Sequence, residues 1–471
     1  MSRTQIIQGG SLLGRWAAPL AYALMIVAAV MAFLLIAQWG ESLKAPATAT
    51  LATPQRGGPS GHTVSPLMHV LLVLMVVVAL GRLLSKLFAR FHQPPVIGEV
   101  LAGIALGPSL LGQIWPEASD FLLPADVAGH LSVLAQLGVV LYMFVVGLEL
   151  NAGLLRDRAH ATIAISHASI LAPFLLGALL ALWLYPRLAH GHVGFTSFSL
   201  FLGVAMSVTA FPVLARILTD RGLTKTTLGI VAISCAATDD VTAWCLLALV
   251  VGVTQAKVAG ALWIIAGTLA FLAAMFLLVR PGIERLLRRH DGPLTPGKTA
   301  LVFVAVLGSA LTTEWIGVHA IFGAFLLGAV IPHDSRLAKE LTYKLEDFVT
   351  VLLLPAFFAF TGMRTRIGLV SGLDAWLMCG LVLAVATLGK FGGTLGAARL
   401  AGLSWRDGAA LGILMNTRGL MELVVLNIGL DLGIISPTLF AMMVIMAVVT
   451  TMATTPILAK LTKDGKMLRP A

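Results

Sequence analysis

Apolar stretches of about twenty residues, separated by short polar gaps, repeat along almost the whole chain. A helix of about 20 apolar residues is long enough to cross a bilayer, so this spacing predicts an all-α polytopic membrane protein. The predicted spans cover about 16–39, 65–84, 94–113, 129–150, 162–185, 197–219, 227–252, 259–280, 299–315, 316–332, 347–363, 374–398, 408–430 and 436–459. Fourteen spans place both ends of the chain on the same side of the membrane.

Composition and charge agree with this pattern. Hydrophobic residues make up 58% of the chain and charged residues 11%, against roughly 45–50% and 25% in soluble domains. Most of the 32 Lys and Arg residues fall in the loops and ends on one side of the predicted topology. The positive-inside rule identifies that side as the cytoplasm. The formal charge of +10 therefore reflects topology, and nucleic acid is not an expected partner.

The first 64 residues form a separate segment, with an apolar helix over about 17–37 and an outer loop rich in Pro, Gly, Ala and Thr over 41–63. The apolar stretch exceeds the roughly 7–15 residues of a signal-peptide core, which favours a retained helix or signal anchor. A cleaved signal peptide is the alternative, and it would leave 13 spans. Residues 65–460 then form one transmembrane domain, and 461–471 a short cytoplasmic tail.

Two of the predicted spans contain signals for a helix break. In the span 197–219, Ser207 and Thr209 precede Pro212, which removes a backbone donor and disfavours helix geometry at the preceding residue. In the span 408–430, Asn-Thr-Arg-Gly stands at 416–419. The two spans cross the membrane in opposite directions in the predicted topology. This relation is typical of inverted repeats whose broken helices cross at mid-membrane and form a binding site.

Three charged residues are predicted to lie near the middle of the membrane. Asp239 and Asp240 stand side by side at the midpoint of the span 227–252. One aspartate at that depth costs about 2.5–3.5 kcal/mol, so the pair indicates a cation or proton site. Lys390, at mid-span in 374–398, is too deep to reach water easily, and a carboxylate of this pair is its expected partner. A purely structural ion pair is the alternative.

Arg418 and Glu422 lie four residues apart within the second broken span. This spacing places them on one helix face, where they can pair with each other. We expect them to neutralise each other and to brace the helix break. A direct part in ion binding is the alternative.

Five segments in order resemble the cation:proton antiporter-2 family, including the plant cation/H+ exchangers and bacterial Na+/H+ antiporters. The resemblance covers about 65–460, and its blocks are QPPVIGEVLAGIALGPSLLG, LGVVLYMFVVGLEL, VAMSVTAFPVLARIL, IGVHAIFGAFLLGAVIP and NTRGLMELVVLNIGL. It implies two crossed discontinuous helices in a core domain that moves, as an elevator, against a dimerisation domain. A homodimer is therefore expected.

The resemblance also implies roles for individual residues. Asp240 is the carboxylate that exchanges the cation for protons, Asp239 matches the position that pairs with Lys390, and Thr209, with its neighbour Ser207, matches the unwound stretch that supplies oxygens to the ion. Many relatives of the plant exchangers have Asn-Asp at the pair. Asp-Asp here implies, by the same analogy, two protons per cation.

The sequence therefore predicts a secondary-active antiporter that exchanges Na+ or K+ for protons, without a cofactor and without enzymatic activity. Its expected location is the cell membrane, a bacterial inner membrane, with both ends in the cytoplasm if the first helix is retained. A sodium-coupled organic-anion symporter of similar broken-helix architecture is the alternative. Carboxylate, hydroxyl and carbonyl oxygens suit either ion, so the sequence leaves Na+ and K+ open.

Overall fold

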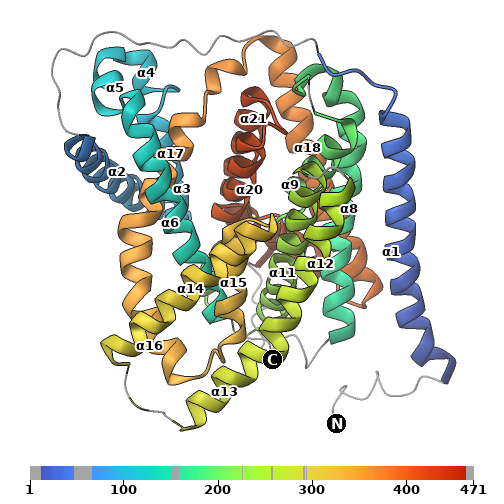
Figure 1. The fold of residues 1–471 in the computed structure, drawn as a ribbon. Coiled ribbons are helices and arrows are strands. Elements are labelled where there is room, and N and C mark those ends of the chain that lie inside the picture. The colour runs from blue at the N-terminus through green and yellow to red at the C-terminus, as the bar shows by residue number, and fades with distance from the viewer. Residues whose placement is uncertain are drawn as a thin grey trace.

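The computed structural model describes residues 12–46, 66–150, 159–255 apart from His192 and Lys225, 258–289, and 292–462 apart from Pro293. The regular elements within these ranges are helices (Figure 1). Twelve of them are long and apolar enough to cross a membrane, or thirteen when one bent pair of helices counts as a span. This result confirms the predicted all-α polytopic class. Most of the predicted loop 41–63 and of the tail 461–471 falls outside the described residues.

Most of the helices pack as two groups, which we name the core bundle and the scaffold bundle. The core bundle consists of α8 (Ala159–Leu188), α9 (Phe195–Ser207), α10 (Phe211–Asp220), α11 (Thr227–Gln255), α18 (Gly372–Leu400), α19 (Trp405–Met415), α20 (Leu420–Asp431) and α21 (Pro437–Thr462). The scaffold bundle consists of α2 (Pro66–Ala89), α3 (Pro95–Leu106), α6 (Ala125–Glu149), α14 (Pro296–Ile316), α15 (Ala320–Val330), α16 (Arg336–Phe348), the π-helical turn η2 (Val349–Leu353) and α17 (Leu354–Arg364).

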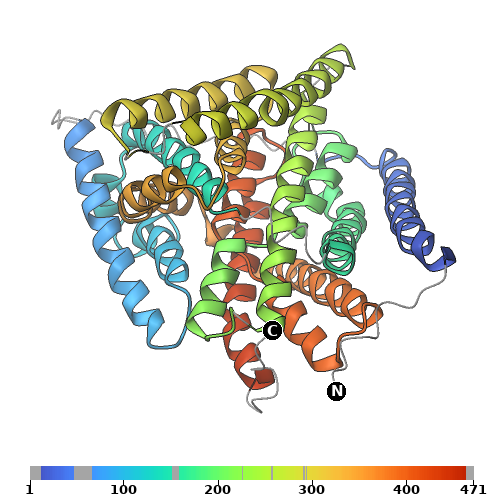
Figure 2. The ribbon, with the colours of Figure 1, turned by 90° about the horizontal axis from the view of Figure 1, so that it is seen from below.

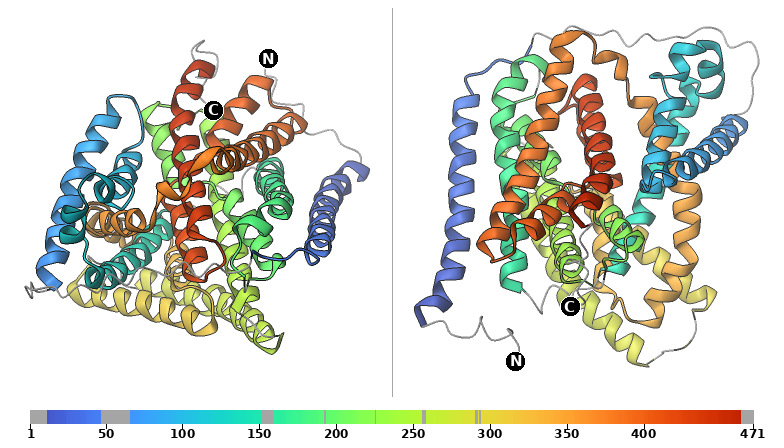
Figure 3. Two further views of the ribbon diagram at one scale, coloured as in Figure 1. Left: turned by 90° about the horizontal axis from the view of Figure 1, so that it is seen from above. Right: turned by 180° about the vertical axis from the view of Figure 1, so that it is seen from behind.

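The remaining elements lie at the edges of the two bundles or connect them. They are α1 (Leu12–Gly40), α4 (Leu111–Ile114), α5 (Pro116–Leu122), α12 (Val258–Ala274), the π-helical turn η1 (Met275–Val279), α13 (Arg280–Arg289) and the 3₁₀ turn η3 (Ile367–Leu369). Helix α1 stands against α8 at one edge of the molecule (Figures 1 and 3). Helices α12, α13 and α14 extend along one long side (Figure 2).

The two bundles face each other across α20 and α21, which stand between the scaffold helices and the other core helices (Figure 1). Within the core bundle, α18 packs along α8, and α8 packs along α9. Within the scaffold bundle, α6 packs against α15 and α17, and α2 packs against α3. Between the bundles, α21 contacts α3, and it also contacts the connecting turn η3. The fold therefore has two compact bodies with an interface between them.

Three predicted boundaries differ from the observed helices. The predicted span 316–332 is the helix α15, which has only 11 residues and follows a left-handed turn at Gly317 (φ 98°). The predicted span 347–363 is extended at its start by α16. The predicted loop after residue 280 begins as the helix α13. Both α13 and α16 are amphipathic and rich in charge, so a search for apolar stretches misses them.

Both predicted helix breaks are present in the structure. The first span ends as α9 at Ser207 and resumes as α10 at Phe211, with Pro212 in the first turn, where its missing N–H is not needed. The second span is divided between α19 and α20, which meet at an angle of 46°. The amide of Ala210 donates to the carbonyl of Thr417 across 3.0 Å, so a backbone hydrogen bond joins the two breaks.

Candidate ion-binding site

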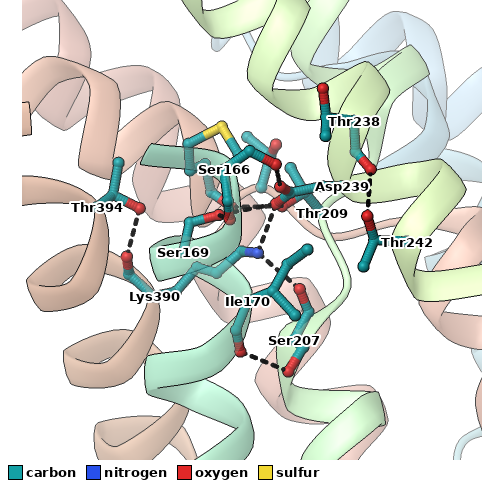
Figure 4. A network of polar contacts seen from close by, with 12 residues as sticks. Ser166, Ser169, Ile170, Ser207, Thr209, Thr238, Asp239, Thr242, Lys390 and Thr394 are labelled. Atoms are coloured by element: carbon teal, nitrogen blue, oxygen red, sulfur yellow. Dashed lines mark hydrogen bonds and ion pairs between the residues drawn. The ribbon is translucent and has the colours of Figure 1, made fainter. Parts of the chain in front are cut away.

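The two adjacent aspartates lie near the middle of α11 and are both buried. Asp239 points toward α8 and α18, where polar side chains surround its carboxylate (Figure 4). Lys390 Nζ lies 2.9 Å from Asp239 Oδ2, and both side chains are fully shielded from solvent. The structure thus places Lys390 against the first aspartate of the pair.

Three hydroxyl groups also reach the Asp239 carboxylate (Figure 4). Ser166 Oγ donates to Oδ1 across 2.5 Å, and the hydroxyls of Ser169 and Thr209 lie 2.9 and 2.8 Å from Oδ2. The last two have a second acceptor, because Ser169 Oγ is also 2.7 Å from the Ser166 carbonyl and Thr209 Oγ1 is 3.2 Å from the Met415 carbonyl. Each hydroxyl carries one proton, so Ser169 and Thr209 divide theirs between two acceptors.

Ser207 does not direct its hydroxyl toward either aspartate. Its Oγ donates within its own helix to the Gly203 carbonyl at 2.7 Å and lies 3.0 Å from the Ile170 carbonyl. The backbone carbonyl of Ser207, in contrast, accepts from Lys390 Nζ across 2.6 Å. The expected Ser207 hydroxyl is therefore turned away from the carboxylates in this structure.

Asp240 has a different environment from its neighbour. It is 2% exposed, and neither of its carboxylate oxygens meets a side-chain donor among the described residues, while the backbone amide of Phe211 at the start of α10 faces the carboxylate. A buried carboxylate without a side-chain partner is unfavourable unless it holds a proton, a cation or water. Of the two aspartates, Asp240 is the one whose oxygens are available to a ligand.

Two cavities reach from one end of the bundle interface toward the first helix break. Their volumes are about 210 and 420 Å³. Both are lined by Tyr142, Pro212, Arg216 and Thr350, so they share a wall, and the larger one is also lined by Phe211 in the first turn of α10. The carboxylates that line these cavities are Glu99 in the smaller and Glu149 and Glu346 in the larger.

The second break positions Arg418 on the end of the first broken helix. Arg418 Nη1 and Nη2 donate to the carbonyls of Ala205 and Met206 across 3.0 and 2.7 Å. These carbonyls belong to the last turn of α9, where the helix dipole favours a cation. Arg418 and Lys390 therefore occupy the carbonyls that the first break frees.

The predicted pair of Arg418 with Glu422 is present, with Nη1 and Oε2 3.4 Å apart and both side chains fully buried. The Arg418 amide donates to Thr451 Oγ1 on α21, and the same hydroxyl lies 2.8 Å from the Arg418 carbonyl. Gly419 allows α20 to start close to α10, because an added Cβ would lie 2.8 Å from Val213 Cγ2. Arg418 thus ties the second break to α9, α20 and α21.

The other end of the bundle interface is bridged by a polar network that we name the Arg364 network. Arg364 on α17 donates to Asn427 Oδ1 at 3.1 Å and forms an ion pair with Asp431, both on α20. Asn427 Nδ2 donates in turn to Thr361 Oγ1 across 2.9 Å. These bonds connect the scaffold bundle directly to the core bundle.

Sequence reasoning missed Ser166, Ser169 and Thr451. The two serines are three residues apart and so share one helix face, but serine is common in membrane helices and their target lies on another helix. Within the described part of the chain, no group of three or more His, Cys, Asp or Glu side chains is arranged to hold a metal ion.

Two broken helices that cross beside buried carboxylates define an ion-transporting class of membrane protein. Comparison with known proteins gives the family. The model of the transmembrane sodium/hydrogen exchanger family matches residues 72–460, and the chain belongs to this family.

Individual relatives agree with this assignment. The chain is 45% identical to the Na+/H+ antiporter NhaS4 of Synechocystis over 84% of its length and 97% of that relative. It is 38% identical to cation/H+ antiporter 17 of Arabidopsis thaliana and 34% identical to K+/H+ antiporter 1 of Saccharomyces cerevisiae, over 86% and 83% of its length. The chain spans about half the length of these two relatives, 50% and 46%.

A solved structure has the same fold. The sodium proton antiporter MjNhaP1 from Methanocaldococcus jannaschii superposes with a TM-score of 0.61, over 86% of this chain and 99% of that one. The two sequences are 15% identical, so this likeness concerns the fold alone.

Proposed function

We propose that the protein exchanges a monovalent cation, Na+ or K+, for protons across the membrane, and that the cation and the proton compete for Asp240. The observation that carries this proposal is the contrast within the aspartate pair. Asp239 is surrounded by side-chain donors, whereas the buried Asp240 carboxylate meets no side-chain donor among the described residues and faces the backbone amide of Phe211. A lone carboxylate binds a hard monovalent cation or a proton, but not both at once.

The rest of the cation shell comes from neutral oxygens. Thr209 supplies a hydroxyl when its proton is directed to the Met415 carbonyl, 3.2 Å away, because its lone pairs are then free to face an ion. Water from the two cavities completes the shell. The carbonyls of Ala205, Met206 and Ser207 are held by Arg418 and Lys390 and stay outside it.

Exchange across the membrane requires access from both sides in turn. The cavities open at the end of the molecule where α13 and α16 lie (Figure 1), and the Arg364 network closes the other end. The positive-inside rule makes the end with α13 cytoplasmic, so this conformation faces the cytoplasm. We propose that the core bundle moves against the scaffold bundle as an elevator, in a homodimer in the cell membrane.

A sodium-coupled organic-anion symporter is not supported, because the relatives named above are all antiporters. The names of these relatives include both Na+ and K+. The choice between the two ions therefore depends on measurement.

The decisive experiment uses purified protein in liposomes with a trapped pH dye. Addition of NaCl or KCl, but not choline chloride, should move protons through the wild type and identify the ion. Asp240→Asn should abolish this flux while the protein stays folded, as judged by thermal unfolding. Ser199→Ala is the matched control, since Ser199 is buried with no hydrogen-bond partner among the described residues. Cation-dependent proton flux that survives in Asp240→Asn would contradict the proposal.

A further inference from the structure

The donors around Asp239 are not equivalent. Ser169 and Thr209 share their protons with backbone carbonyls, whereas the described contacts of the Ser166 hydroxyl give it one acceptor, Asp239 Oδ1, at 2.5 Å. Lys390 approaches the other oxygen, Oδ2. Both carboxylate oxygens are therefore engaged, one of them by Ser166 alone.

The geometry points to a positioning role for Ser166. We propose that Ser166, supported by Ser169, holds Asp239 as the permanent ionised partner of Lys390, so that cation and proton exchange takes place at Asp240 alone. This inference rests on the proposed antiport function and extends it to the coupling ratio. It assigns one proton per cation, in contrast to the two protons per cation that the Asp-Asp pattern implies by resemblance.

The charges support this ratio. Asp239 and Lys390 together carry no net charge, and neither changes during the cycle. Asp240 is neutralised either by one monovalent cation or by one proton, so the loaded site has the same charge in both directions. Exchange then moves no net charge. A site that stayed empty and ionised would carry an unpaired buried charge across the membrane, which is unfavourable.

The packing around the pair leaves Lys390 little freedom to leave Asp239. Lys390 Nζ is held at the same time by the Ser207 carbonyl at 2.6 Å. Helix α18 approaches α8 so closely that a Cβ added to Gly389 would lie 2.7 Å from Pro173 Cα. The helix that carries Lys390 is thus fixed against the helix that carries Ser166.

The charged and titratable groups near Asp239 among the described residues are few. On α11 they are Asp240 and the thiol of Cys235, and beyond Lys390 lies Arg418 from the second break. Helix α8 and the break between α9 and α10 contribute hydroxyl groups to the carboxylate. His167, next to Ser166, packs its ring against Tyr22 on α1. Loss of the Ser166 hydroxyl therefore acts on Asp239 without removing a neighbouring charge.

Two measurements on the reconstituted full chain test the proposal, namely proton flux with the trapped dye and charge movement on a solid-supported membrane. The wild type should show cation-dependent proton flux without a sustained transport current. Ser166→Ala should bind a proton at Asp239 about tenfold more tightly, since a hydrogen bond to a charged group is lost. Its pH profile should gain a protonation step on the acid side, with a transport current. Ser166→Thr keeps the hydroxyl and should restore the wild-type profile.

The outcomes separate the proposal from the function on which it rests. Wild-type flux accompanied by one net charge per cation would overturn the fixed role of Asp239 and leave antiport intact. A pH profile of Ser166→Ala that matches Ser199→Ala would overturn the role of Ser166. If Ser166→Ala does not fold, the wild-type current still decides the coupling ratio, and Ser169→Ala should show a smaller acid-side change. No cation-dependent flux in the folded wild type would overturn the antiport function itself.

Discussion

Two polar networks hold helices together in this molecule, and they differ in burial and in what they connect. The network at the crossing contains Asp239, Lys390, Arg418 and Glu422, all with side chains fully buried or nearly so, and it joins helices of the core bundle. The Arg364 network joins the two bundles, and the side chains of its ion pair, Arg364 and Asp431, are 23% and 48% exposed.

This difference indicates which contacts stay closed during transport. Breaking a buried ion pair leaves an uncompensated charge and costs about 3–5 kcal/mol, whereas an exposed pair contributes about 0–1 kcal/mol. The crossing network therefore keeps the core bundle rigid. In the proposed elevator cycle, the Arg364 network is the contact that opens, because it is the weaker network and joins the two bundles.

The largest expected effect follows from the crossing network. Arg418→Ala leaves Glu422 without its partner and two carbonyls of α9 without their donors, so the free energy of unfolding should fall by about 3–5 kcal/mol. Chemical unfolding in detergent, compared with Ser199→Ala, measures the loss. A loss below about 1 kcal/mol would show that Arg418 does not hold the two breaks together.

The second prediction concerns the other buried pair. Lys390→Met should lower the free energy of unfolding by about 3 kcal/mol, because an ionised Asp239 remains buried without its cation. Adding Asp239→Asn removes that charge and should recover more than about 1 kcal/mol of the loss. Unfolding of the two single variants and the double variant completes a double-mutant cycle. Simple additivity would contradict a direct interaction between the two charges.

A smaller effect is expected at the outer end of the interface. Asp431→Asn removes the ion pair with Arg364 and should destabilise the cytoplasm-facing conformation by about 1 kcal/mol relative to the outward-facing one. The ratio of the two conformations should then change roughly fivefold. Stability should change little. Labelling of a cysteine introduced at the bundle interface reports the shift, with Asp374→Asn at the exposed start of α18 as the control. An unchanged labelling rate would mean that the Arg364 network does not set the orientation.

The smallest effect is expected at the inner end. Glu346→Gln removes one carboxylate from the lining of the larger cavity and should raise the apparent Michaelis constant for the cation about twofold. The change should disappear at high ionic strength, because exposed charges are screened there. Liposome flux at two salt concentrations, balanced with choline chloride, tests this. A salt-independent change would indicate a direct ligand rather than a charged vestibule.

The sequence predicted those features that follow from local chemistry. Charges at mid-span, the proline in the first break and the Asn-Thr-Arg-Gly break in the second are each visible within a few residues. The donors to Asp239 could not be predicted in the same way. Ser166 stands 73 positions before Asp239, and its role depends on how α8 packs against α11.

Arg418 also has partners that local sequence patterns could not predict. Its spacing from Glu422 predicts their contact, but its shorter hydrogen bonds reach the end of a helix more than 200 positions earlier. The amphipathic helix α16 was missed because its charged residues interrupt the apolar pattern by which spans are recognised. Local patterns thus predicted the elements and the candidate charges, whereas the partners of these charges required the fold.

Helix α1 has a consequence for the surroundings of the protein. It contacts α8 and α9 of the core bundle, and most of its surface faces outward. If the core bundle moves, α1 moves with it and changes its depth relative to the surrounding bilayer. Hydrophobic mismatch costs fractions of a kcal/mol per Å, so the free-energy barrier for movement of the core bundle should depend on the acyl-chain length of the lipids. The turnover rate of this protein should therefore depend on bilayer thickness.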